Sequence, residues 1–151
     1  MTEITILVLV LLAALAFGLV WRYRAGRVRA TSAEPIAADS GARGRLLAAA
    51  GVTGSAPAVL HFSADWCGPC DAVRRVVAGV VADLADAPQP PLDIEIDIDA
   101  EPALAKELNV LSLPTTFIFD ADGRERFRIS GVPKATDLHS AITPLTMRDA
   151  A

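Results

Sequence analysis

The sequence predicts an α/β fold, a central mixed sheet flanked by helices, that follows an N-terminal transmembrane helix. Three observations predict it: an uncharged apolar run at 4–20, alternating strand-like and helix-like segments in the second part, and a pair of cysteines directly after one strand-like segment. A chain of 151 residues has room for one domain of ordinary size. We expect a transmembrane anchor at 1–21, a flexible basic linker at 22–44 and the folded domain at 45–151.

The apolar run from Ile4 to Val20 predicts a single membrane span. Its 17 uncharged residues would cover roughly 25 Å as a helix, near the lower limit for crossing a bilayer. Aromatic residues follow at 21 and 23, where interfacial side chains belong. A signal peptide would begin with positive charge, whereas Glu3 is the one charged side chain before this run. A buried core helix would seldom be apolar on every face.

The residues after the span are basic and indicate the orientation of the chain. Four arginines lie between 22 and 29, while Glu3 is the charged side chain on the other flank. By the positive-inside tendency, the domain would face the cytoplasm. An extracytoplasmic placement stays open, because a cysteine pair of this kind can work on either side. The segment 22–40 has no sustained apolar period, which is typical of a tether.

Charge divides the chain into two parts. Residues 1–45 hold six arginines against three acidic groups, whereas the remainder holds eight basic against fifteen acidic groups. An acidic domain offers no basic surface to nucleic acid. We therefore expect proteins as its partners.

The folded domain begins with a short helix and a buried strand. The helix is expected at 45–50, and the apolar run at 58–63 predicts the strand. The helix that follows has one apolar face, formed by Val73, Val76, Val77, Val80, Val81 and Leu84.

The second half of the domain predicts two more strands, a hairpin turn and two helices. Apolar residues alternate with acids over 92–99, the period of a strand. A short helix at 102–108 follows, and Asn109 can end it. Strands at 115–119 and 125–130 flank an Asp-Gly turn, and a last helix at 135–142 would stop before Pro144.

Cys67 and Cys70 are the most informative residues, in the segment Trp66-Cys67-Gly68-Pro69-Cys70. Two intervening residues let both sulfurs meet on one helical turn, so that one thiol can attack and the other can resolve. Structural zinc needs four ligands, and beyond these cysteines the chain offers His61 and His139. We therefore expect no metal, and packing alone does not explain Gly-Pro between two cysteines.

This segment resembles the active site of the thioredoxin family. A second element agrees with the resemblance, because Leu113-Pro114-Thr115 matches the family's cis-proline loop. The resemblance covers about Ala56 to Ile142 and implies a thioredoxin-like fold. It also implies a strand and a helix before the strand at 58–63, of which the helix alone has a recognisable pattern.

The resemblance implies a role for each matching residue. Cys67 is the expected nucleophile, placed at a helix start that favours a thiolate. Cys70 would then resolve the mixed disulfide. The cis-proline leaves the backbone of Leu113 available to an extended substrate. The expected substrate-binding residues are Trp66, Gly68, Pro69, Leu113, Pro114 and Gly131, with Val132 beside them on the rim.

Three positions depart from the family pattern. His61, nine residues before Cys70, stands where the family has a buried aspartate, and Glu95 stands where that aspartate has a lysine partner. We expect His61 and Glu95 to form a pair under the active site, with His61 relaying a proton for Cys70. The alternative is a strand histidine bonded to backbone. Asp71 is acidic where the family is often basic, and Arg74 or Arg75 would compensate it.

Together these features predict a membrane-tethered thiol–disulfide oxidoreductase that reduces protein disulfides through Cys67 and Cys70. Its partners would be protein disulfides, an electron donor such as a thioredoxin reductase or a membrane thiol carrier, and the membrane through residues 4–20. No bound cofactor is expected. The alternatives are an extracytoplasmic relative that maintains thiols or assists cytochrome assembly, and a binding module with the thioredoxin fold but no turnover.

Overall fold

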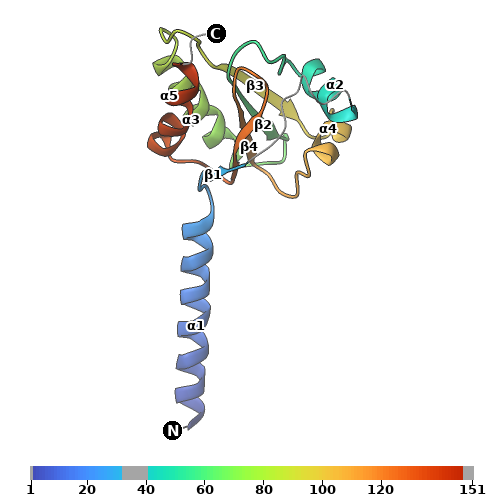
Figure 1. The fold of residues 1–151 in the computed structure, drawn as a ribbon. Coiled ribbons are helices and arrows are strands. Elements are labelled where there is room, and N and C mark those ends of the chain that lie inside the picture. Colours follow the sequence, from blue (N-terminus) through green and yellow to red (C-terminus); the bar gives the residue numbers. More distant parts are fainter. Residues whose placement is uncertain (1, 32–40, 148–151) are drawn as a thin grey trace.

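A long N-terminal helix stands apart from the rest of the molecule (Figure 1). The computed structural model describes residues 2–31 and 41–147. Helix α1 spans Thr2–Arg24, and its segment Glu3–Val20 has a mean hydropathy of 2.7 with none of it buried. Among the described residues, α1 is the one helix that is long and apolar enough to cross a membrane.

In the described part of the chain, five strands form one mixed sheet in the order β1-β5-β4-β2-β3. Strand β2 pairs parallel with β3 and antiparallel with β4, and the other pairs are antiparallel. The expected mixed sheet is therefore confirmed. The strands are β1 (Arg29–Ala30), β2 (Ala58–Ser63), β3 (Leu92–Asp97), β4 (Thr115–Phe119) and β5 (Glu125–Ser130).

Helices cover both faces of the sheet (Figure 1). Alternate residues of β2 point to opposite faces, so that Leu60 and Phe62 join one apolar cluster while Val59 joins the other. His61, two residues after Val59, lies on the same face of β2 as Val59. The first face carries α2 (Ala42–Ala49) and α4 (Pro102–Glu107), and the second carries α3 (Cys70–Asp83) and α5 (Ala135–Thr146).

Most expected elements lie where the patterns indicate. The hairpin strands occupy 115–119 and 125–130, and Asn109 ends α4 with a φ of 52°. The expected stop before Pro144 is wrong, because α5 continues through this proline to Thr146. Leu145 is 5% exposed and Thr146 is fully buried. Burial of these two side chains offsets the backbone hydrogen bond that a proline cannot donate.

The expected linker contains an ordered strand. Arg29 and Ala30 pair with Arg128 and Phe127 of β5. The structure thus differs from the flexible linker expected over 22–44: 22–24 belong to α1, backbone pairing fixes 29–30 at the edge of the sheet, and 42–44 belong to the helix Ala42–Ala49. Residues 32–40 of that segment lie outside the described residues.

Candidate active site

Cys67 and Cys70 form a disulfide at the junction of β2 and α3. Their sulfurs are 2.03 Å apart and their Cα atoms 5.5 Å apart. Cys67 is 8% exposed and Cys70 is 1% exposed. Both pack in a small apolar cluster with Ala64, against which Leu113 also packs. Cys67 is thus the sulfur that a partner can reach first.

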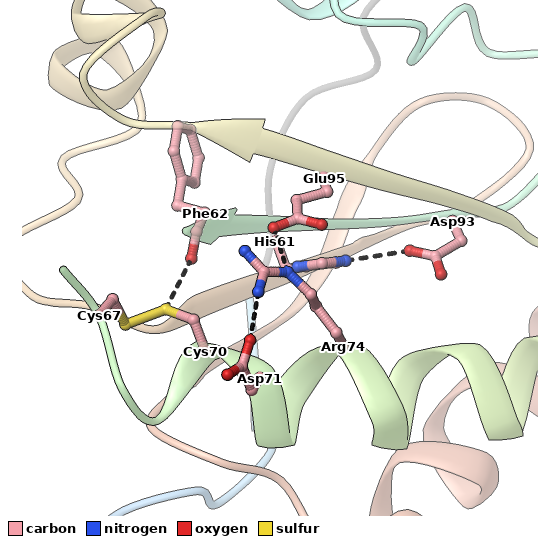
Figure 2. Close-up of polar contacts among 8 residues, drawn as sticks. All are labelled: His61, Phe62, Cys67, Cys70, Asp71, Arg74, Asp93 and Glu95. Atoms are coloured by element: carbon pink, nitrogen blue, oxygen red, sulfur yellow. Dashed lines mark hydrogen bonds and ion pairs between the residues drawn. A yellow bond between two sulfur atoms is a disulfide. The ribbon is translucent and has the colours of Figure 1, made fainter. Parts of the chain in front are cut away.

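The two cysteines differ in their relation to helix α3. We had expected Cys67 at the start of a helix, but helix α3 begins at Cys70 with Pro69 as its N-cap, so Cys67 lies in the turn that precedes it. The N–H of Cys70 donates to the carbonyl of Cys67 at 3.1 Å, and the N–H of Cys67 donates to Ala64 at 3.0 Å. The Sγ of Cys70 lies 3.9 Å from the carbonyl oxygen of Phe62 (Figure 2). The positive end of the helix dipole still lies beside the pair.

The loop that contains Leu113 and Pro114 lies next to the disulfide. Their peptide bond is cis, as the resemblance implied. Leu113 is partly buried against the cysteines. The carbonyl of Pro114 accepts the N–H of Gly131 at 2.8 Å, and Gly131 has a φ of +90°. A glycine suits this backbone conformation, which other residues rarely adopt.

Three of the six residues expected to receive a substrate are exposed, whereas Leu113 and Gly131 are half-buried and Pro114 is buried. Trp66 is 70% exposed, and its Nε1 donates to Asp99 at 3.0 Å. Its indole is therefore a surface group rather than part of the core. Gly68 and Pro69 are also exposed, and Val132 is 38% exposed.

His61 has a different partner from the one we expected. Its side chain is buried, and its Nε2 lies 3.0 Å from Oδ1 of Asp93 (Figure 2). Glu95 is opposite His61 in the strand register, yet it accepts a hydrogen bond of 2.6 Å from Nε of Arg74. The expected direct pair between His61 and Glu95 is thus replaced by two pairs, because Asp93 and Arg74 each reach one partner.

Arg74 links the acidic side chains next to α3 (Figure 2). It donates to Glu95 from β3 and to Asp71 in its own helix. Arg74, one of two arginines expected to compensate Asp71, therefore contacts this carboxylate. Burial alone would raise the pKa of Glu95, but hydrogen bonds from Ser63 and Arg74 and the nearby positive charge lower it. The hydrogen bond to Glu95 is the main cause of the raised pKa of Arg74.

Two polar residues of this region were not identified from the sequence. Asp93 could have been found, because it lies two residues before Glu95 and therefore on the same face of β3, next to His61. Thr116 lies opposite His61 in the neighbouring strand β4. Its hydroxyl is buried without a hydrogen-bond partner among the described residues. No sequence signal distinguishes this threonine from a strand residue. Across the described residues, no group of three or more His, Cys, Asp or Glu could hold a metal ion.

A mixed sheet with a redox-active disulfide before a helix, next to a cis-proline, defines the class of thiol–disulfide oxidoreductases. The family model "Thioredoxin" matches residues 49–144. This match covers more than half of the chain, and the chain belongs to the thioredoxin family.

Individual relatives agree with this assignment. The chain is 39% identical over 77 residues to a thioredoxin of Mycolicibacterium smegmatis, covering 51% of this chain and 67% of that protein. It is 36% identical over 76 residues to a bifunctional thioredoxin reductase/thioredoxin of Mycobacterium leprae, covering 50% of this chain and 16% of that protein. A mutant thioredoxin from Halobacterium salinarum has 30% identity and a TM-score of 0.55, covering 67% of this chain and 85% of that structure.

Proposed function

We propose that this chain is a single-pass membrane protein whose thioredoxin domain reduces disulfide bonds of other proteins. Membership of the family implies disulfide substrates and a reductase as donor. The observation that carries the proposal is the pair Cys67–Cys70 beside the cis-proline, in which Cys67 is 8% exposed and Cys70 is 1% exposed. This arrangement separates an attacking thiol from a resolving one.

The reaction follows from this asymmetry. The thiolate of Cys67 attacks one sulfur of the substrate disulfide, forms a mixed disulfide and releases the other sulfur as a thiolate. Cys70 then loses its proton and attacks the sulfur of Cys67. The Cys67–Cys70 disulfide forms, and the second substrate sulfur leaves. Two electrons pass to the substrate, and a donor must return two electrons to the pair.

Substrate binding is assigned to the backbone of Leu113 and to the surface around it. A cis-proline next to the disulfide supports strand-like pairing with an extended substrate segment. Exposed Trp66, Gly68 and Pro69 lie within the cysteine motif. The backbone N–H of Gly131 donates a hydrogen bond to Pro114 of the cis-proline loop. We expect these residues to contact the substrate chain.

Proton transfer to and from Cys70 is assigned to His61, with Asp93 as its partner. When Nε2 donates to Asp93, a neutral imidazole presents Nδ1 as an acceptor. His61 adjoins Phe62, whose carbonyl contacts Cys70. Glu95 acts in this scheme through Arg74, which it orients beside Asp71 and the start of α3.

The donor is expected to be a thioredoxin reductase or a membrane thiol carrier. The Mycobacterium leprae relative is a bifunctional thioredoxin reductase/thioredoxin. This combination supports a reductase as partner of the present domain. Adding a purified thioredoxin reductase with NADPH to the full chain in detergent, and following NADPH oxidation, tests the pairing.

Membrane anchoring is supported by the length, composition and exposure of α1. A cleaved signal sequence meets the same criteria of length and composition. Alkaline carbonate extraction of membranes, followed by intact-mass measurement, separates the two. An anchor predicts a full-length chain retained in the membrane pellet, whereas a signal sequence predicts a shortened chain in the supernatant.

The domain is expected on the cytoplasmic side because the flank after the span is rich in arginine. An extracytoplasmic domain that maintains thiols or assists cytochrome assembly is the alternative. Labelling of intact cells with a membrane-impermeant maleimide, after mild reduction, decides between them. Labelling that needs cell lysis supports the cytoplasmic side, and labelling of intact cells contradicts it.

Catalytic turnover is tested with the full chain in detergent and insulin as the disulfide substrate. The reduced protein, supplied with dithiothreitol, should accelerate insulin reduction, and Cys67→Ser should not. Equal rates for both proteins would instead favour a binding module that retains the fold without turnover.

A further inference from the structure

The chain that leaves α1 is bound directly to the domain. Gly26 is buried, and its N–H donates to the carbonyl of Ser130 at 2.6 Å. Strand β1 then pairs with β5, and the N–H of Thr31 donates to Arg126 at 2.7 Å. A Cβ atom on Gly26 would lie 2.2 Å from the carbonyl oxygen of Val132. Backbone therefore packs on backbone where the helix meets the domain, and Figure 1 shows β1 at this junction.

This junction adjoins the redox site. Gly131 directly follows Ser130, and its N–H donates to the carbonyl of Pro114 at 2.8 Å. A Cβ atom on Gly131 would lie 3.3 Å from the backbone N of Gly26. Leu113 packs against the cysteines. The loop that contains Gly131 and the loop that contains Leu113 and Pro114 therefore lie between the end of α1 and the disulfide. The disulfide thus lies at the end of the domain that carries α1.

The junction is close to the apolar end of α1. The apolar window ends at Val20 and the helix ends at Arg24, a rise of about 6 Å. The headgroup region adds about 5–8 Å on each side of the hydrocarbon core. If α1 spans the membrane, Gly26 and Val132 lie at headgroup level.

The surface at this level combines basic and apolar side chains. A cavity of about 490 Å³ is lined by Leu19 of α1, the junction residues Ala25 to Arg27, and Val132, Lys134 and Asp137 of the domain. Arg27 and Lys134 suit the anionic headgroups of a cytoplasmic leaflet. Exposed Trp66 and Leu111 flank the cysteines and the cis-proline loop in sequence and suit an apolar segment near a membrane.

We propose that the redox site works at the membrane surface on integral membrane proteins whose disulfide lies within about ten residues of their own span. The inference rests on the proposed function and adds the class of substrate. The thiolate of Cys67 attacks the substrate disulfide and Cys70 releases the reduced substrate, so the dithiol pair is oxidised while the substrate gains two electrons. A fixed junction holds the site near the headgroups, and disulfides far from the membrane meet it less often.

The test uses the full chain in nanodiscs of phosphatidylcholine and phosphatidylglycerol, together with single-span model peptides. One peptide carries a disulfide loop about 5 residues after its span, and a second carries the same loop about 40 residues away on a Gly/Ser spacer. The same loop as a soluble peptide is the reference substrate. The reduced protein should reduce the near loop about tenfold faster than the distant loop.

A matched variant carries about 20 Gly/Ser residues between Arg24 and Ala25, with a mean reach of about 25 Å. Its near-to-distant rate ratio should fall to within about twofold, while its rate on the soluble peptide stays unchanged within about twofold. The rate on the soluble peptide also shows that the variant is folded.

Equal rates on both loops in the original chain would overturn the proposal, as would a preference that survives the insertion. In either case, reduction of the soluble peptide would leave the proposed function intact. Failure to reduce the soluble peptide would overturn the proposed function itself. If the insertion variant does not fold, the comparison of both loops in the original chain still decides.

Discussion

The imidazole of His61 lies 3.0 Å from the carboxylate of Asp93, on the face of β2 that also supports helix α3. His61 is buried, whereas the side chain of Asp93 is 33% exposed. The pair therefore connects the interior under the cysteines with solvent. The neighbouring residue Phe62 contacts the sulfur of Cys70 through its carbonyl. We propose His61, the neighbour of Phe62 in β2, as the group that exchanges a proton with Cys70.

Replacing His61 with Ala should slow the resolution of the mixed disulfide more than its formation. We expect resolution to slow about a hundredfold, because general-base assistance ordinarily contributes about a hundredfold or more. Rapid acid quenching with a peptide disulfide measures both steps. Asp93→Asn should give a smaller effect in the same direction. Equal slowing of both steps would assign His61 a structural role.

The ion pair between Glu95 and Arg74 should make stability depend on pH. The pKa of Glu95 is lowered below 4.5 in the folded chain. Its contribution to the free energy of unfolding is therefore present above about pH 4.5 and is lost as the pH falls through the lowered value. Denaturant unfolding should show the full chain more stable than Glu95→Gln at pH 7, with the difference reduced at pH 3.5. A difference that is independent of pH would contradict the pairing.

Removing Arg74 should reduce the reactivity of Cys67. Arg74→Gln leaves the carboxylate of Asp71 without the cation that it contacts, one residue after Cys70. A carboxylate without this cation disfavours a nearby thiolate. Iodoacetamide should alkylate Cys67 of the reduced variant several-fold more slowly at pH 7. Arg75→Gln, which removes the same charge one residue away, is the control and should leave the rate unchanged, whereas equal slowing in both would indicate a general charge effect.

Gly131→Ala should weaken the binding of protein substrates specifically. At a φ of +90°, an alanine costs about 1–2 kcal/mol, and its Cβ would crowd Gly26 at 3.3 Å. The loop bonded to Pro114 would shift, so we expect a higher KM for insulin and a nearly unchanged rate with a small aromatic disulfide. Gly79→Ala is the matched control, because a Cβ there meets nothing within 4 Å. A similar loss with both substrates would indicate general damage to the fold.

The features predicted from sequence are those that have a local pattern. The cysteine motif, the proline loop, the alternating segment at 92–99 and the Asp-Gly hairpin can each be recognised from a few neighbouring residues. The alternating segment forms β3 over 92–97. The family resemblance implied a strand before the first helix of the domain, but the sequence could not locate β1, because two residues carry no period and their pairing with β5 depends on long-range packing. The persistence of α5 through Pro144 likewise depends on the burial of Leu145.

The polar contacts under the site were predicted less well for a related reason. Counting along the chain from the family motifs selected His61 and Glu95 as a pair, and the structure places them opposite each other in the register of β2 and β3. Their partners depend on where side chains extend from the sheet. Asp93 reaches His61 diagonally, and Arg74 reaches Glu95 from the helix. No spacing in the sequence fixes such diagonal contacts.

The most direct test of the account is a trapping experiment with the full-length protein in nanodiscs. Reduced Cys70→Ser is mixed with an oxidised peptide disulfide, and the products are measured by non-reducing mass spectrometry. The account predicts a stable adduct between one peptide sulfur and Cys67 that dithiothreitol releases, while Cys67→Ser accumulates no comparable adduct. The absence of an adduct in Cys70→Ser, or an equal yield of adducts in both variants, would contradict Cys67 as the attacking nucleophile of a disulfide reductase.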